Sequence, residues 1–346
     1  MAFTAASVIA STTSGAAPAG ASPRPGVRVE HNLTYGTYDG HPLRLDVYLP
    51  PRPGRERAAA LLIHGGGFWS GDKEDYRAQA EAFAREGYVG FAIDYTLSGF
   101  VRGAPLDSSF RHGYPLQVHE CQQALRWIED HARRFGIDRH RIVVWGGSAG
   151  GYLSAMVATL GPGRPGYVPV AAAVALSGPL NPLQLRKDYD AGERCRPTGC
   201  AIAELTLARF GWYLGCEIWK CSWRFLAEVS PVDHVTRHTP PFFIYNGTKE
   251  VIPLDQATTM AARLRADRVP VQLMVLPTEH HGPPSLEDVR IPIARFLAAH
   301  VPPPPPPGHV LRWVLIGVAA VLVALGVVAL LFVRRRRQRG SRADLL

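Results

Sequence analysis

Between residues 27 and 300, short apolar runs alternate with longer amphipathic segments. The apolar runs, several of them bounded by Gly or Pro, predict buried strands at 58–63, 88–95, 141–145, 168–176, 242–245 and 271–276. Helical patterns predict helices at 76–86, 116–135, 149–160, 254–266 and 286–300. The opening segment 27–49 predicts an antiparallel strand pair that turns at Asp39-Gly40. This order favours an α/β domain with a mostly parallel central sheet and helices on both faces.

Residues 179–230 interrupt the alternation and predict an inserted cap. This stretch is rich in aromatic residues, among them Trp212, Tyr213, Trp219 and Trp223. It also holds four of the five cysteines, Cys195, Cys200, Cys216 and Cys221. Their clustering favours two disulfides, with three pairings open. Four unrelated thiols are the alternative, and zinc ligation lacks the short CxxC spacing of structural sites. The fifth cysteine, Cys121, falls on the predicted helix 116–135, where a small core residue is expected.

A second hydrophobic pattern occupies the C-terminal part of the chain. Residues 302–307 are six consecutive prolines, which predict a semi-rigid stalk over 301–310. The apolar run 313–333 has 21 residues without a charge, which matches the roughly 20 that a helix needs to cross a bilayer. We therefore predict one transmembrane helix at 311–333. The basic tail 334–346 opens with Arg334–Arg337, and such clusters stay cytoplasmic, so the domain before the helix is expected outside.

That orientation requires export, for which residues 1–26 offer a poor signal. No Lys or Arg precedes Arg24, and the apolar stretch 2–10 is short and interrupted by Thr and Ser. We interpret 1–26 as a disordered tail or a degenerate signal segment. The expected product is a single-pass membrane protein whose domain at 27–300 is extracytoplasmic, and the clustered cysteines suit an oxidising compartment.

Composition and charge exclude disorder throughout and a nucleic-acid partner. A chain of 346 residues with 47% hydrophobic residues can bury a large core. The formal net charge is +9, but residues 311–346 contain seven Arg and one Asp and supply +6 of it. The +3 that remains is ordinary for the rest of the chain, so the basic charge points to the lipid bilayer as a partner.

A candidate nucleophile lies at the junction between the strand 141–145 and the helix 149–160. The sequence Gly146-Gly147-Ser148-Ala149-Gly150 is a G-x-S-x-G motif in the strand–turn–helix context that a nucleophile elbow requires. Small neighbours are needed because the strained turn lifts the serine hydroxyl above the sheet. Ser148 is therefore the predicted nucleophile.

A second motif follows the strand 58–63 directly and reads His64-Gly65-Gly66-Gly67. Glycines let the backbone bend so that N–H groups point at a developing oxyanion. We expect the N–H groups of Gly66, Gly67 and Ala149 to form the oxyanion hole. His64 lies before the serine in the chain, and we interpret it as a support for this loop.

These motifs give the chain a specific resemblance: it resembles the α/β-hydrolase esterases of the hormone-sensitive-lipase-like and feruloyl-esterase-like branches. The matching segments span roughly residues 40–300 and are HGGGFWSGDK at 64–73, DYTLS at 94–98, PLQVHECQQALRWI at 115–128, GIDRHRIVVWGGSAGG at 136–151 and SPVDHV at 230–235. The resemblance implies an α/β-hydrolase fold and a catalytic triad in the order serine, acid, histidine.

By the same resemblance, the acid follows the penultimate strand and the histidine follows the last. Glu250 stands at the position of the acid, although the family usually has Asp there and one more residue before the Pro that follows. Asp255 is the alternative acid, and it also suits the first turn of the helix 254–266, where a carboxylate favours the helix dipole. His281 precedes a glycine, as the family's base does, and His280 is the alternative base.

The sequence thus predicts a membrane-anchored serine esterase, a carboxylic-ester hydrolase that needs no metal and no organic cofactor and acts on a small-molecule ester through an acyl-enzyme. One alternative is a formamide or amide hydrolase resembling kynurenine formamidase, which shares the histidine-glycine-glycine loop and the elbow. Another is a surface binding domain that kept the fold and lost catalysis.

Overall fold

The computed structural model describes most of the chain between residues 26 and 302: 26–100, 110–111, 113–161, 163, 165–191, 208, 210–282 and 286–302. The N-terminal segment before residue 26, most of the predicted stalk, the predicted transmembrane helix at 311–333 and the basic tail lie outside the described residues. Within the described ranges, no helix has the length and apolar character that crossing a bilayer would need.

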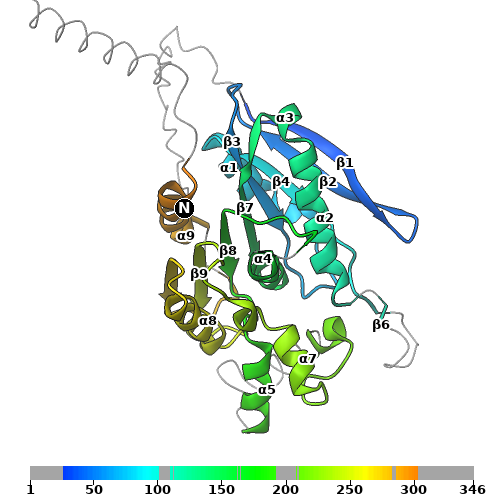
Figure 1. Cartoon of the computed structure of the whole chain (residues 1–346), viewed down its shortest axis with the longest axis vertical. Helices are drawn as coiled ribbons and strands as arrows, with labels where there is room; N and C mark the ends of the chain where they lie inside the picture. Colours follow the sequence, from blue (N-terminus) through cyan, green and yellow to red (C-terminus); the bar gives the residue numbers. More distant parts are fainter. Residues whose placement is uncertain are drawn as a thin grey trace, which may run out of the picture.

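An eight-stranded, mostly parallel sheet forms the centre of the fold, in the order β1-β2-β4-β3-β7-β8-β9-β10 (Figure 1). Its strands are β1 (Arg28–Tyr38), β2 (His41–Leu49), β3 (Arg57–Ile63), β4 (Val89–Ile93), β7 (Ile137–Gly147), β8 (Ala172–Leu176), β9 (Phe242–Gly247) and β10 (Val271–Leu276). The predicted pair at 27–49 is β1 and β2, and both the β1–β2 and β2–β4 pairs are antiparallel. From β4 to β10 every neighbouring pair is parallel, as the alternation of strands and helices predicted.

Helices cover both faces of the sheet, which explains why its central strands are apolar at almost every position. The helices α1 (Arg77–Arg85) and α9 (Leu286–His300) pack on one face with Val143 and Trp145 of β7. The helices α2 (Leu116–Asp130), α4 (Ala149–Leu160) and α8 (Leu254–Ala266) pack on the other face with Val144. Because successive strand residues point to opposite faces, β7 contributes to both cores.

Several predicted elements differ in their bounds from the observed ones. The strand predicted at 141–145 is the longer β7, and the strand predicted at 88–95 is the shorter β4. The helix predicted at 116–135 is divided: α2 ends at Asp130, and the short α3 (Ala132–Phe135) follows and stops at Gly136, whose φ of 64° is left-handed. The strand predicted at 168–176 begins only at Ala172, because the residues before it form an irregular approach to β8. The remaining elements are the 3-10 helices η1 (Lys73–Tyr76) and η2 (Pro231–His234) and the small strands β5 (Gly99–Phe100) and β6 (Phe110–Arg111).

The predicted cap forms helices beyond one end of the sheet, α5 (Pro182–Asp190) and α7 (Trp223–Glu228) (Figure 1). A disulfide joins Cys216 and Cys221, while Cys195 and Cys200 lie outside the described residues. Cys121 is a free, buried thiol on α2, as expected of a core residue.

Much of the cap's aromatic content packs against other parts of the protein. Tyr213 is fully buried and stacks on Phe68 with ring centroids 3.8 Å apart. Trp219 stacks on Tyr189. These contacts make Tyr213 and Trp219 packing residues that join the cap to itself and to the loop after β3.

Candidate active site

Ser148 occupies a sharp turn between β7 and α4. Its backbone has φ 55° and ψ −120°, a conformation that non-glycine residues rarely adopt. Nearby glycines make room for the turn: a Cβ added to Gly150 would lie 1.9 Å from the carbonyl oxygen of Ile63. The Ser148 N–H donates to the carbonyl of Leu176, 2.8 Å away, which ties the turn to the end of β8. This is the geometry that the G-x-S-x-G motif predicted.

The structure brings Ser148, His281 and Glu250 together in one hydrogen-bonded chain. His281 Nε2 lies 2.8 Å from Ser148 Oγ, and His281 Nδ1 lies 2.7 Å from Glu250 Oε2. Glu250 follows β9 and His281 follows β10, and the carboxyl ends of parallel strands meet at one edge of the sheet. With its proton on Nδ1, the imidazole donates to the carboxylate and leaves Nε2 free to accept the serine proton.

Glu250 is fully buried, and its charge is held by hydrogen bonds to both oxygens. Oε1 accepts from the N–H of Gly247 at 2.6 Å and from the Ser177 hydroxyl at 2.8 Å. Oε2 accepts from His281 and, at 3.4 Å, from the N–H of Gly282. A buried carboxylate is stable only when paired and hydrogen-bonded in this way, so the environment suits an ionised acid.

The two alternative residues occupy other surroundings. Asp255 begins α8, accepts a hydrogen bond from the Gln256 side chain and shares a hydrogen bond with the carboxyl group of Asp188. Burial, followed by this contact, raises the pKa of Asp188 from its ordinary value of 3.8 to about 6. His280 is exposed, and its backbone N–H donates to the Thr278 hydroxyl. Neither Asp255 nor His280 belongs to the hydrogen-bonded chain that begins at Ser148.

The glycine-rich loop after β3 lies against the serine turn. A Cβ added to Gly65 would lie 3.0 Å from the carbonyl of Gly147 and 3.4 Å from Ser148 Cβ, so loop and turn are in contact. Gly66 has φ 99° and Gly67 has φ 63°, and the Gly66 carbonyl accepts from the N–H of Ser70. Among the described residues, the N–H groups of Gly66, Gly67 and Ala149 donate to no backbone carbonyl. They are therefore available to an oxyanion at Ser148.

His64 is buried beneath this loop and does not reach outward. Its Nδ1 lies 2.8 Å from the carbonyl of Gly65, and its ring stacks on Tyr95 with centroids 4.1 Å apart. The Tyr95 hydroxyl donates to the carbonyl of His64. Burial lowers the pKa of His64, so the imidazole is neutral at pH 7. This arrangement suits support of the loop.

Two further supports were not singled out from the sequence. Ser98 donates to the carbonyl of Phe68 from both its N–H and its hydroxyl, at 2.7 and 3.0 Å. The buried carboxylate of Glu120 on α2 accepts from the N–H and hydroxyl of Thr96, at 2.7 and 2.6 Å. Together they fasten the loop 94–98 between α2 and the glycine-rich loop. An acid at a core-facing helical position is rarely buried without a partner, and this is the signal that could have identified Glu120.

One group of side chains among the described residues has metal-ligand spacing: His31, Asp46 and Glu74 offer atoms within 4.8 Å of one another. The ammonium of Lys73 lies 3.8 Å from Asp46 and 3.7 Å from Glu74. The lysine ammonium already neutralises these carboxylates, so we interpret the group as an ion-pair network.

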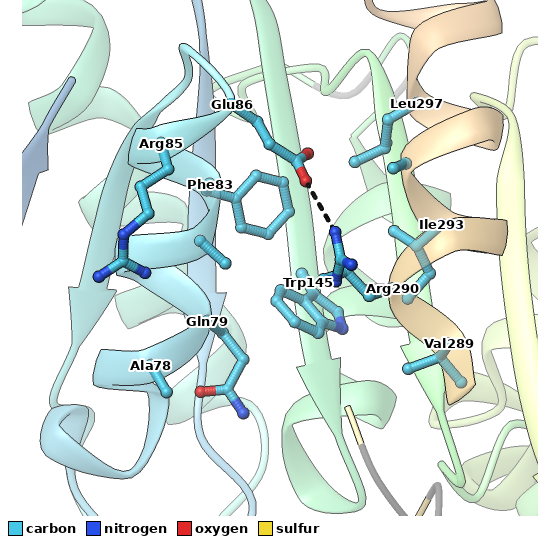
Figure 2. Close-up of a pocket in the computed structure, with 12 residues that line it drawn as sticks. Ala78, Gln79, Phe83, Arg85, Glu86, Trp145, Val289, Arg290, Ile293 and Leu297 are labelled. Carbon is cyan, nitrogen blue, oxygen red and sulfur yellow. Dashed lines mark ion pairs between the residues drawn. The ribbon is translucent and has the colours of Figure 1, made fainter. Parts of the chain in front are cut away.

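A separate pocket of about 470 Å³ lies between α1 and α9, on the face of the sheet that carries Trp145 (Figure 2). Figure 2 shows Trp145 across its floor, Phe83 and Gln79 on the α1 side, and Ile293 on the α9 side. The residues that line it include none of Ser148, Glu250 and His281. This pocket is distinct from the triad.

Comparison with known proteins agrees with this geometry. The BD-FAE family model matches residues 45–264. The chain is 31% identical to carboxylesterase NlhH of Mycobacterium tuberculosis over 280 residues, covering 75% of this chain and 76% of NlhH. It is 30% identical to esterase LipC of the same organism over 266 residues, covering 71% of this chain and 58% of LipC. The chain thus spans less than two thirds of the length of LipC.

Among solved structures, esterase 2 of Thermogutta terrifontis has a similar fold, with a TM-score of 0.60 and 24% identity over 82% of this chain and 96% of that one. The sheet order, the serine turn and the family match lead to the same assignment, and the chain belongs to the BD-FAE family of α/β-hydrolases.

Proposed function

We propose that the chain is a serine hydrolase that cleaves carboxylic esters through an acyl-enzyme and is anchored in a membrane by residues 311–333. The observation that carries the catalytic part is the hydrogen-bonded chain from Ser148 through His281 to Glu250. The names of its relatives NlhH and LipC, a carboxylesterase and an esterase, support ester hydrolysis as the reaction class.

In this mechanism His281 takes the proton of Ser148 as Oγ attacks the ester carbonyl. Glu250 keeps the imidazole oriented and stabilises the imidazolium that forms. The N–H groups of Gly66, Gly67 and Ala149 hold the tetrahedral oxyanion, a contribution that typically amounts to several kcal/mol of transition-state stabilisation. His281 then gives its proton to the leaving alcohol, and water repeats the sequence on the acyl-enzyme.

The unusual backbone conformation of Ser148 suits this mechanism. A left-handed serine between a strand and a helix presents its hydroxyl to solvent, while the N-terminus of α4 lies directly beneath it. The N–H groups and the dipole at that helix end favour negative charge on the tetrahedral intermediate.

An activity-based experiment tests the catalytic proposal. A fluorophosphonate probe should label the purified protein at Ser148, and the Ser148→Ala variant should stay unlabelled. Paraoxon is a suitable second reagent, since a solved structure of Thermogutta terrifontis esterase 2 carries its phosphoryl group. Absence of labelling by both reagents, together with no turnover of p-nitrophenyl acetate, would support a non-catalytic binding domain. Faster turnover of N-formylkynurenine than of p-nitrophenyl acetate would support a formamide hydrolase.

The anchoring proposal rests on the sequence, with support from the disulfide. The apolar run and the arginines after it favour a spanning helix with its C-terminal end in the cytoplasm. The Cys216–Cys221 disulfide suits an oxidising exterior for the domain. Protease added to intact cells should remove the domain and leave the tail protected. Survival of the domain until the membrane is lysed would overturn the outward orientation.

A further inference from the structure

Ser177 follows β8 directly and is held in an unusual backbone conformation. Its φ is 50°, in the left-handed region, and its side chain is 1% exposed. A non-glycine residue in this region costs roughly 1–2 kcal/mol, so such residues persist only where their surroundings hold them. The Ser177 N–H donates to the carbonyl of Tyr245 at 2.8 Å, which fixes the residue against β9. From this position its hydroxyl donates to Glu250 Oε1 at 2.8 Å.

The end of β8 therefore contacts both ends of the triad. The carbonyl of Leu176 accepts the N–H of Ser148 at 2.8 Å, and the side chain of the next residue, Ser177, bonds the acid. Leu176 is the last residue of β8 and Ser177 is the next residue in the chain, so the end of one strand holds both the Ser148 turn and the Glu250 carboxylate in place.

The identity of the acid explains why such a contact is needed. A glutamate has one more rotatable bond than an aspartate, so its carboxylate can turn away from the histidine more easily. Oε1 is fixed by Ser177 and the N–H of Gly247, which leaves Oε2 directed at His281 Nδ1. Ser177 is the side-chain donor to Oε1 among the described residues, whereas the Gly247 contact comes from a backbone N–H, which every substitution except proline retains.

We propose that Ser177 is a positioning residue of the triad, whose hydroxyl holds Oε1 of Glu250 so that Oε2 stays on His281. This proposal rests on the proposed serine-hydrolase function. It requires that loss of the hydroxyl weakens proton transfer and leaves substrate binding intact, because Ser177 bonds the acid and no group that faces the ester.

The test compares Ser177→Ala and Ser177→Gly with the wild-type full-length protein in esterase assays. Both variants lack the hydroxyl, but only glycine relieves the left-handed backbone. We expect kcat to fall on the order of 10- to 100-fold in both, as for loss of a hydrogen bond to a charged group, with KM changed by less than about twofold. The glycine variant should melt no lower than the alanine variant. Ser154→Ala is the matched control, since it removes an equally buried hydroxyl that bonds no described group.

A double-mutant cycle separates positioning from a structural role. In a Glu250→Ala background the carboxylate is gone, so adding Ser177→Ala should cost less than about twofold in kcat. If Ser177→Ala lowers kcat in that background as much as it does in the wild type, the proposal is overturned. It is also overturned if Ser177→Ala and Ser177→Gly leave kcat unchanged, or if they change only KM. Equal losses in Ser177→Ala and Ser154→Ala would likewise point to packing.

A proton NMR measurement keeps this proposal separate from the function on which it rests. The hydrogen-bonded Nδ1 proton of His281 should give a downfield resonance in the wild type that disappears in His281→Ala. We expect it to move or broaden in Ser177→Ala and to stay unchanged in Ser154→Ala. If the wild type hydrolyses no ester, the reaction assignment fails and the resonance still decides the Ser177–Glu250–His281 coupling. If the wild type is active but Ser177→Ala changes neither the resonance nor kcat, the positioning role of Ser177 is rejected and the proposed esterase function stands.

Discussion

The imidazole of His281 lies 2.8 Å from the hydroxyl of Ser148, although 133 residues separate them in the chain. The contact is made by two loops that leave the same edge of the sheet, one after β7 and one after β10. The strands β7, β8, β9 and β10 that connect these loops form an unbroken parallel array. The rigidity of that array keeps the imidazole of one loop within hydrogen-bond distance of the hydroxyl on the other.

Ser148→Ala should abolish ester hydrolysis without unfolding the domain. Alanine keeps the same backbone requirement at φ 55° and removes only the hydroxyl. Loss should be on the order of 10⁶-fold in kcat, as in dissected triads. Activity on p-nitrophenyl esters and the melting temperature check both statements. Residual activity above about a tenth of the wild type would reject Ser148 as the nucleophile.

Glu250→Gln should cost far more activity than Asp255→Asn. The glutamine loses the charge that stabilises the imidazolium, a change that costs about 10⁴-fold in a related triad. Asp255 bonds Asp188 and Gln256, so the Asp255→Asn variant should show a kcat/KM lower by less than about threefold. The reverse ranking in a steady-state assay would transfer the role of acid to Asp255.

His281→Ala should remove activity to nearly the extent of Ser148→Ala, because the two groups act as a unit. His280→Ala is the matched control: the adjacent ring is exposed, so its loss should leave kcat/KM within about twofold. Comparable losses in the two variants would contradict this assignment of the base.

The contact between Asp188 and Asp255 should make the attachment of α5 pH-dependent. The pKa of Asp188 is raised to about 6, so the folded state holds this proton more tightly than the unfolded state does. The stabilisation of the folded state by this proton is complete below about pH 4 and is lost as the pH rises through about 6. Asp188→Asn imitates the protonated form and should raise the melting temperature by roughly 1–3 °C at pH 8.

At pH 4 the same substitution should change the melting temperature little, since wild-type Asp188 then carries its own proton. Asp190→Asn on the same helix is the control, because Asp190 pairs with Arg186. An equal gain for Asp188→Asn at both pH values would contradict a titrating contact.

The pocket between α1 and α9 should be dispensable for ester hydrolysis. Ala294→Leu would project an apolar side chain into it from α9. Filling such a space commonly adds roughly 0.5–2 kcal/mol of stability, so the melting temperature should rise by a few degrees while kcat/KM is unchanged. A fall in kcat/KM of more than about fivefold would place substrate in this pocket.

The sequence by itself determined the fold class and the turn that holds Ser148, the proposed nucleophile, because both depend on local pattern. Strands that are buried on both faces must be apolar along their length, and this gives the alternation of apolar strands with helices. The turn at Ser148 has no room for a Cβ at the nearby glycines, so those positions must be glycine. Elements with strong periodicity were therefore predicted close to their observed bounds. The division after Asp130 was missed, since a single helical period continues across it.

Only the tertiary structure decided which carboxylate and which imidazole join the hydrogen-bonded chain that begins at Ser148, and which residues support them. Family order favoured Glu250 and His281, but Asp255 and His280 stand close to them in the chain, and spacing alone does not fix where a loop side chain points. The fold resolves this by directing Glu250 inward to four hydrogen-bond donors and by placing the His281 ring between Glu250 and Ser148. Ser177 had no motif to mark it, because its contact with Glu250 joins two loops 73 residues apart that meet only when β8 and β9 pair.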